Sequence, residues 1–143
     1  RVGGYSARLM RSAVVGAATP RQQEVAAVLF DLQDRQMAAM RTGAAARDVD
    51  AIMRDGQIAA GLRTRYDNIT GYTLGFYHRA GTRTSDFTRI FGPNVDYALE
   101  SGMVFHVYAA AQGLACSETV LVTPQGGQRL TLLERKLFVA GAA

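Results

Sequence analysis

The chain has 143 residues, of which 48% are hydrophobic and 20% charged, a composition typical of one folded domain and not of a disordered chain. Its net charge is +4, but the basic residues are spread along the chain among acidic ones, so we expect no nucleic-acid partner. No apolar run reaches the roughly 20 residues that span a bilayer, and no leader pattern is present, so we expect no membrane partner.

The first third of the chain predicts one strand and two helices. Residues 5–16 hold alternating and β-branched apolar positions, which indicate a strand. Apolar residues recur at spacings of three to five over 21–41, which predicts an amphipathic helix with Thr19 as N-cap and Pro20 at its first position. A second helix is expected over 46–62, where glycines mark its C-terminal end.

The remaining two thirds predict strands. Runs at 71–77, 103–110 and 116–123 have strand character, and a Pro- and Gly-containing turn leads to a returning strand over 128–133. Residues 78–98 are polar without a period and predict a long loop, of a length that is usually functional or mobile. Helices in one block and strands in another predict an α+β fold, with the helices on one face of a largely antiparallel sheet.

Cys116 is the single cysteine, which excludes an internal disulfide and favours a cytoplasmic location. Its place among apolar strand residues predicts a buried small hydrophobe and not a nucleophile.

Four stretches follow one another along the chain: YSARLMRSAVVG, GYTLGF, ESGMVFHV and SETVLVTPQGGQRLT, of which the last is the most specific. Taken together, they resemble the creatinase/aminopeptidase P family, whose catalytic domain has the pita-bread fold. The resemblance covers nearly all of residues 1–143 as a single domain. It implies a partial pita-bread domain with a curved sheet, because a full one is longer and has a first strand and an upstream domain before it. It also implies a homodimer.

Metal-dependent members of this family bind two ions through two Asp, one His and two Glu. By the resemblance, the first Asp would precede residue 1, Arg8 stands at the second, Tyr72 at the His and Tyr108 at the first Glu. Glu118 keeps a ligand type. Since four positions are lost and an arginine repels cations, we expect no metal and no other cofactor.

The stretches YSARLMR, GYTLG and GMVFH are similar to the ectoine hydrolase and creatinase-like branch. This implies metal-independent hydrolysis of a C–N bond in a small zwitterionic compound, such as an ectoine-like substrate. Such hydrolysis needs a base for water and an acid for the departing nitrogen. His106, on the strand face opposite its apolar neighbours, and Glu118, on the face of Val120, are the catalytic candidates, and both are expected on the floor of the cleft. An ion pair with Arg8 is one partner open to Glu118.

Five further residues are candidates for binding a small-molecule substrate: His78, Arg79, Arg8, Tyr72 and Tyr108. A guanidinium grips a carboxylate through two hydrogen bonds, which is the reason for including the arginines. The family carries a substrate-binding His a few residues after the glycine turn, which implies this role for His78. The alternatives are a solvated loop histidine and core tyrosines with satisfied hydroxyls.

Two other functions stay open at this point. A non-catalytic pita-bread domain that binds a peptide or protein is favoured by the lost metal ligands. A metal-dependent Xaa-Pro aminopeptidase or dipeptidase would keep the chemistry of the family, but the same losses argue against it.

Overall fold

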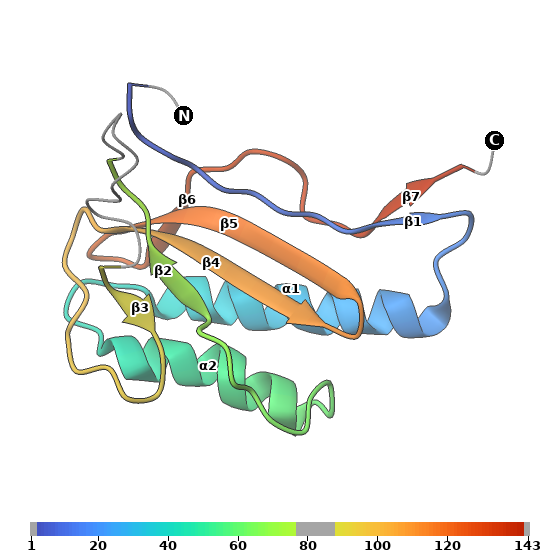
Figure 1. Cartoon of the computed structure of the whole chain (residues 1–143), viewed down its shortest axis with the longest axis horizontal. Helices are drawn as coiled ribbons and strands as arrows, with labels where there is room; N and C mark the ends of the chain where they lie inside the picture. Colours follow the sequence, from blue (N-terminus) through green and yellow to red (C-terminus); the bar gives the residue numbers. More distant parts are fainter. Residues whose placement is uncertain (1–2, 77–87, 142–143) are drawn as a thin grey trace.

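The computed structural model describes residues 3–76 and 88–141, in which two helices cover one face of an antiparallel sheet (Figure 1). The helices are α1 (Pro20–Ala39) and α2 (Ala46–Ala59). The sheet has the strand order β3-β2-β4-β5-β6, made of β2 (Gly71–Thr73), β3 (Ile90–Phe91), β4 (Val104–Ala111), β5 (Leu114–Val122) and β6 (Gly127–Arg129). A separate parallel pair joins β1 (Ala13–Val15) to β7 (Phe138–Ala140). The predicted α+β arrangement is confirmed.

Both helices begin where the sequence predicts. The Thr19 hydroxyl accepts a hydrogen bond from the Gln22 N–H at 3.2 Å, and the Gln22 side chain accepts one from the Thr19 N–H at 2.9 Å. This capping box, followed by Pro20, fixes the start of α1. α2 ends before the predicted residue 62, because Gly61 adopts a φ of 67° and turns the chain. Neither helix of the described residues is long and apolar enough to cross a membrane.

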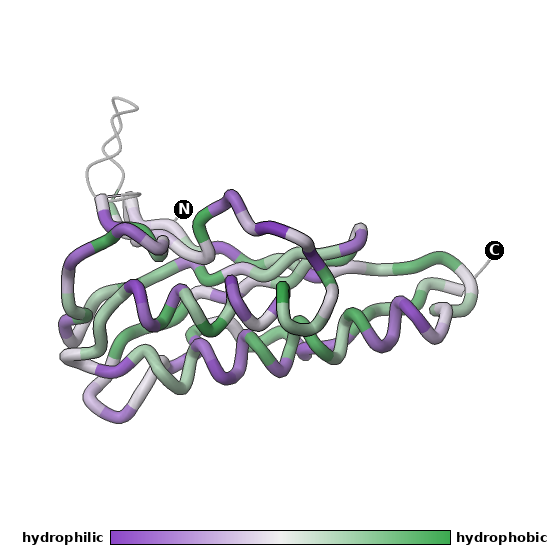
Figure 2. The backbone as a smooth tube through the Cα atoms, turned by 90° about the horizontal axis from the view of Figure 1, so that it is seen from below, coloured by the Kyte–Doolittle hydropathy of each residue, from purple (hydrophilic) through white to green (hydrophobic). Residues whose placement is uncertain are grey.

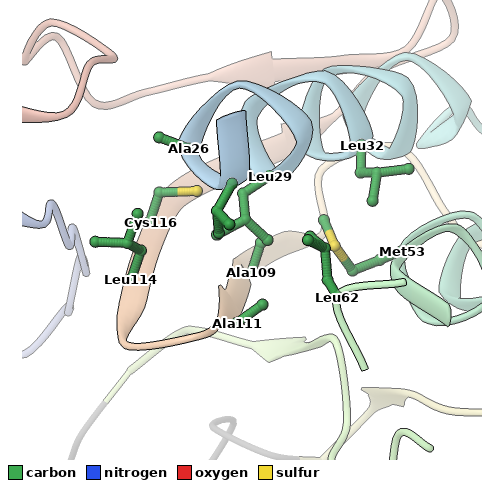
Figure 3. Packing of buried hydrophobic residues seen from close by; sticks show 10 residues of the cluster. Ala26, Leu29, Leu32, Met53, Leu62, Ala109, Ala111, Leu114 and Cys116 are labelled. Carbon is green, nitrogen blue, oxygen red and sulfur yellow. The ribbon is translucent and has the colours of Figure 1, made fainter. Parts of the chain in front are cut away.

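The core lies between the helices and the sheet. In one cluster, apolar side chains of α1 and α2 meet small residues of β4 and β5 (Figure 3). Cys116 belongs to this cluster and is 2% exposed, which confirms the predicted buried hydrophobe, and burial raises the pKa of its thiol to about 11. In the second cluster, Phe91 and Phe105 stack with ring centroids 4.4 Å apart. Hydrophilic and hydrophobic residues are interspersed along both helices, which allows each helix to turn an apolar face to the core (Figure 2).

The predicted strand over 5–16 is wrong for most of its length, since only β1 is regular. The segment instead runs along the edge of β5 and is joined to it partly by side chains. Ser12 Oγ accepts from the Ala115 N–H at 2.8 Å and donates to the Ala115 carbonyl at 3.1 Å. Thr119 Oγ1 holds both backbone groups of Arg8 in the same way. Hydroxyls thus replace ladder bonds that a strand would make with its own backbone.

The returning strand is also shorter than predicted, and it ends at Arg129. Leu130 makes a last hydrogen bond to Thr119 at 2.9 Å, after which Met10 takes the edge of β5 by pairing with Ser117. The predicted loop over 78–98 contains β3, which the sequence analysis missed, as it missed β7. The part of the loop over 78–87 lies outside the described residues.

Gly127 allows β6 to lie close to α1. A Cβ at this position would lie 2.7 Å from Val120 Cγ1 and 2.8 Å from the Met37 carbonyl oxygen. We expect Gly127→Ala to lower the free energy of unfolding by about 1–3 kcal/mol, as overpacking does, measured by urea denaturation. Gly141→Ala is the control, because no atom lies within 4 Å of its Cβ. Equal stability of the two variants would contradict this packing.

Candidate site on the upper face of the sheet

Strand register decides which candidate residues meet. Tyr72 of β2 pairs with His106 of β4, which pairs with Thr119 of β5, and Tyr108 pairs with Ser117. Paired residues and residues two apart project to the same side of a sheet. These five side chains therefore share the face turned away from α1 and α2, which we call the upper face (Figure 1). The predicted orientation of His106, away from its apolar neighbours, is confirmed.

Three aromatic rings form the floor of this face. Tyr72 meets His106 edge-on at 5.0 Å between centroids, and His106 stacks on Tyr108 at 5.4 Å. Burial raises the pKa of Tyr108 to about 12, so its phenol stays protonated at neutral pH. Both tyrosines are packing partners of the imidazole and could also form an apolar platform for a ligand.

Arg8 lies above this floor. Its backbone N–H donates to Thr119 Oγ1 at 2.8 Å, and the same hydroxyl donates to its carbonyl at 2.8 Å. The guanidinium carbon lies 5.4 Å from the centroid of the Tyr72 ring, within cation–π range. The structure thus brings together Arg8, Tyr72, Tyr108 and His106 on one face of the sheet. Their role in binding a ligand stays a prediction.

His106 is neutral at physiological pH. Burial and, second, the positive charge of Arg8 lower the pKa of its imidazole to about 4. Nδ1 is buried and has no hydrogen-bond partner among the described residues. A buried histidine is commonly held by a hydrogen bond to the backbone, and none of the described residues makes one to this Nδ1.

A pocket of about 450 Å³ opens beside this imidazole, lined by Ala7, Arg8, Leu9, Met10, His106 and Ser117. A second pocket of about 820 Å³ shares Ala7 with it and has a largely apolar lining that includes Leu74, Phe76, Met103, Val104 and Leu130. The upper face therefore offers a charged and polar end next to an apolar end.

Glu118 lies on the opposite face, because it pairs with Val107 on the side that packs against α1. It is fully buried, and Thr131 Oγ1 donates a hydrogen bond to it. Within the described part of the chain, three arginines surround its Oε1: Arg11 at 2.5 Å, Arg135 at 3.3 Å and Arg129 at 3.5 Å.

The expectation that His106 and Glu118 share one cleft floor is therefore wrong. Glu118 pairs with Val107, the neighbour of His106 on β4. Because adjacent residues of a strand project to opposite faces of the sheet, Glu118 and His106 lie on opposite faces. The charge of Glu118 is compensated by Arg11 and its neighbours, not by Arg8. Glu118 is therefore not available as the second catalytic group that the proposed metal-free hydrolysis needs.

Ser117 takes the place on the upper face that the sequence analysis gave to Glu118. Its signal was present in the sequence: Gln112 and Gly113 form a two-residue turn with φ of 49° and 80°. Counting pairs outward from Ala111 and Leu114 on either side of that turn places position 117 opposite Tyr108.

His78 and Arg79, the two remaining candidates, lie outside the described residues, and their role stays a prediction.

Comparison with known proteins shows the family. Residues 1–124 match the family described as metallopeptidase family M24. The chain belongs to metallopeptidase family M24. It is 26% identical over 139 residues to a Xaa-Pro dipeptidase of Pyrococcus furiosus, a match that covers 94% of this chain and 38% of that protein.

Solved structures of the family have the same fold. Dipeptidase PepE from Mycobacterium ulcerans superposes with a TM-score of 0.85 at 23% identity, over 99% of this chain and 38% of that one. A dipeptidase from Pyrococcus horikoshii superposes with a TM-score of 0.80 at 26% identity, over 95% of this chain and 38% of that one. The partial pita-bread fold is confirmed. The M24 chain thus spans 38% of the length of these relatives, and the ectoine hydrolase branch stays a prediction.

The family name implies a metal, and the upper face of this M24 chain does not fit one. Among the described residues, its side chains offer one imidazole, two phenols, hydroxyls and a guanidinium, without the carboxylates that bridge paired divalent ions. Residues 3–76 and 88–141 contain no group of three or more His, Cys, Asp and Glu that could hold an ion. Glu118 faces the other way and is already ion-paired.

The buried charge of Glu118 should matter for stability. Glu118→Gln removes the carboxylate charge that Arg11 and Arg129 face, while Arg135 keeps its pair with Asp34, so we expect a loss of about 3–5 kcal/mol in the free energy of unfolding, measured by urea denaturation. Glu100→Gln breaks the exposed pair with Arg89 and is the matched control, with a loss below about 1 kcal/mol. Similar losses in both variants would contradict the burial of this cluster.

The low pKa of His106 predicts a pH dependence. The unfolded chain takes up the proton near pH 6.5 and the folded chain only near pH 4. The contribution of His106 to stability is therefore complete above pH 6.5 and falls as the pH drops towards 4, by at most about 1.4 kcal/mol per pH unit. NMR titration should give a midpoint near 4, with His78→Asn used to assign the signals. A midpoint near 6.5 would refute the burial.

Proposed function

We propose that this chain recognises short peptides of the Xaa-Pro type and binds them on the upper face of its sheet. The observation that carries the proposal is the pair of adjoining pockets, one lined by Arg8, His106 and Ser117 and the other largely apolar. A short peptide has the matching parts, a charged carboxylate close to apolar side chains. The names of the relatives, Xaa-Pro dipeptidase and dipeptidase, support this ligand class.

The residues of this chain support binding better than metal-free catalysis. A general base works best when its pKa is near the operating pH, and burial lowers the pKa of His106 to about 4. Glu118 cannot assist it, since its carboxylate points to the other face. Arg8 can instead attract a carboxylate, and the rings of Tyr72 and Tyr108 can support the ligand from below.

Hydrolysis of the peptide C–N bond is the second candidate function, and the M24 match favours it. In that case the chemistry would be that of a Xaa-Pro dipeptidase or aminopeptidase. The side chains that the structure describes on the upper face do not supply the ligand set for it, which favours binding over hydrolysis.

Calorimetry with Ala-Pro, combined with an assay for released proline, tests both candidates. We expect binding without release of proline, and no change on adding Mn²⁺. Arg8→Gln should weaken binding about tenfold, the effect of losing one charged contact. Arg65→Gln is the control, because Arg65 is exposed and paired with Asp67. Release of proline that depends on Mn²⁺ would favour the second candidate, and absence of binding would refute the first.

A further inference from the structure

Two buried polar side-chain atoms of β4 and β5 lack a hydrogen bond within residues 3–76 and 88–141: His106 Nδ1 and Ser117 Oγ. Ser117 is completely buried and His106 is 8% exposed. Both residues line the pocket of about 450 Å³. Buried polar groups without a partner are rare in folded proteins, and each asks for an explanation such as a missing ligand.

The register of β4 and β5 places the side chains of His106 and Ser117 close to each other on the upper face. His106 pairs with Thr119 and Ser117 pairs with Tyr108, so His106 and Ser117 are diagonal neighbours on β4 and β5. Diagonal neighbours lie about 7–8 Å apart at the backbone, a gap that a small planar group can bridge. No direct bond between the two side chains takes up either atom, in agreement with this spacing.

The charge around the pocket suits an anion. Arg8 lines it, and Thr119 holds the backbone of Arg8 in place. None of the described residues that line the pocket is acidic. The neutral imidazole and the hydroxyl can each donate one hydrogen bond, and a carboxylate can accept both while facing the guanidinium.

We propose that this pocket is a carboxylate-binding subsite, in which Ser117 Oγ and His106 Nδ1 donate to the ligand carboxylate and Arg8 supplies the positive charge. The proposal rests on the proposed function, since the carboxylate is then the C-terminus of the bound peptide. The rest of the peptide extends past Ala7 into the larger apolar pocket. The site thus selects for a free C-terminus, with Ser117 as a specificity-determining residue.

The test compares Ala-Pro with Ala-Pro amide, which lacks the negative charge, by calorimetry. We expect the wild-type chain to bind Ala-Pro at least about tenfold more tightly than the amide, since a hydrogen bond to a charged group is worth that factor or more. Ser117→Ala should weaken Ala-Pro about tenfold and leave the amide unchanged. Ser101→Ala, at an exposed turn, is the matched control and should change neither.

Thermal unfolding separates this role from a structural one. Because Ser117 Oγ has no partner in the described residues, its removal should leave Tm unchanged or raise it. A fall in Tm together with equal loss for both peptides would mean that Ser117 supports the fold, and the subsite would be refuted.

The remaining outcomes separate the subsite from the function. Equal binding of Ala-Pro and its amide overturns the subsite and leaves peptide recognition standing. If neither peptide binds, the proposed function fails. The subsite is then tested separately, by adding acetate to the chain and following its amide signals by NMR. Shifts of the His106 and Ser117 amide signals that disappear in Arg8→Gln would support it, and unchanged signals would overturn it.

Discussion

The pairing of β4 with β5 is the constraint on which the rest of the structure depends. A two-residue turn at Gln112 and Gly113 sets the register, and each following pair assigns one side chain to the helix side and the next to the upper face. One assignment builds the core, where Val107 and Val120 meet α1. The other builds the candidate site. A shift of this register by one residue would move the core side chains of one strand to the upper face and its site side chains to the helix side, which would destroy both the core and the candidate site.

The buried carboxylate of Glu118 ties distant parts of the chain to this hairpin. Arg11 reaches it from the N-terminal segment, Arg129 from the end of β6, and Arg135 from the segment after β6. Arg135 also bonds to α1 through the Gln33 side chain at 3.0 Å. Since a buried charge is tolerated only with close partners, these segments are held against the edge of β5. The N-terminal segment in turn carries Arg8 to the upper face.

Local signals in the sequence predicted both helices and the longer strands that follow them, β4 and β5. The start of α1 depends on Thr19 and Pro20, which act on the turn that they begin, so the prediction needed no tertiary information. The N-terminal segment could not be predicted in this way, because its bonds run from Ser12 and Thr119 to residues about a hundred positions away. Of the site, Arg8, Tyr72, Tyr108 and His106 were predicted to meet. Ser117 was missed because the face of a strand residue follows from register, not from residue type.

The hydroxyl of Thr119 has a consequence for how this surface can change. It binds Arg8 only through the backbone N–H and carbonyl, groups that every residue except proline has in common. The backbone at position 8 is therefore anchored whatever side chain it carries. The sign of the charge above the sheet can therefore change without a change in the backbone that carries residue 8. One substitution of Arg8 by an acidic residue can turn a surface that attracts anions into one that attracts cations, while the segment keeps its path.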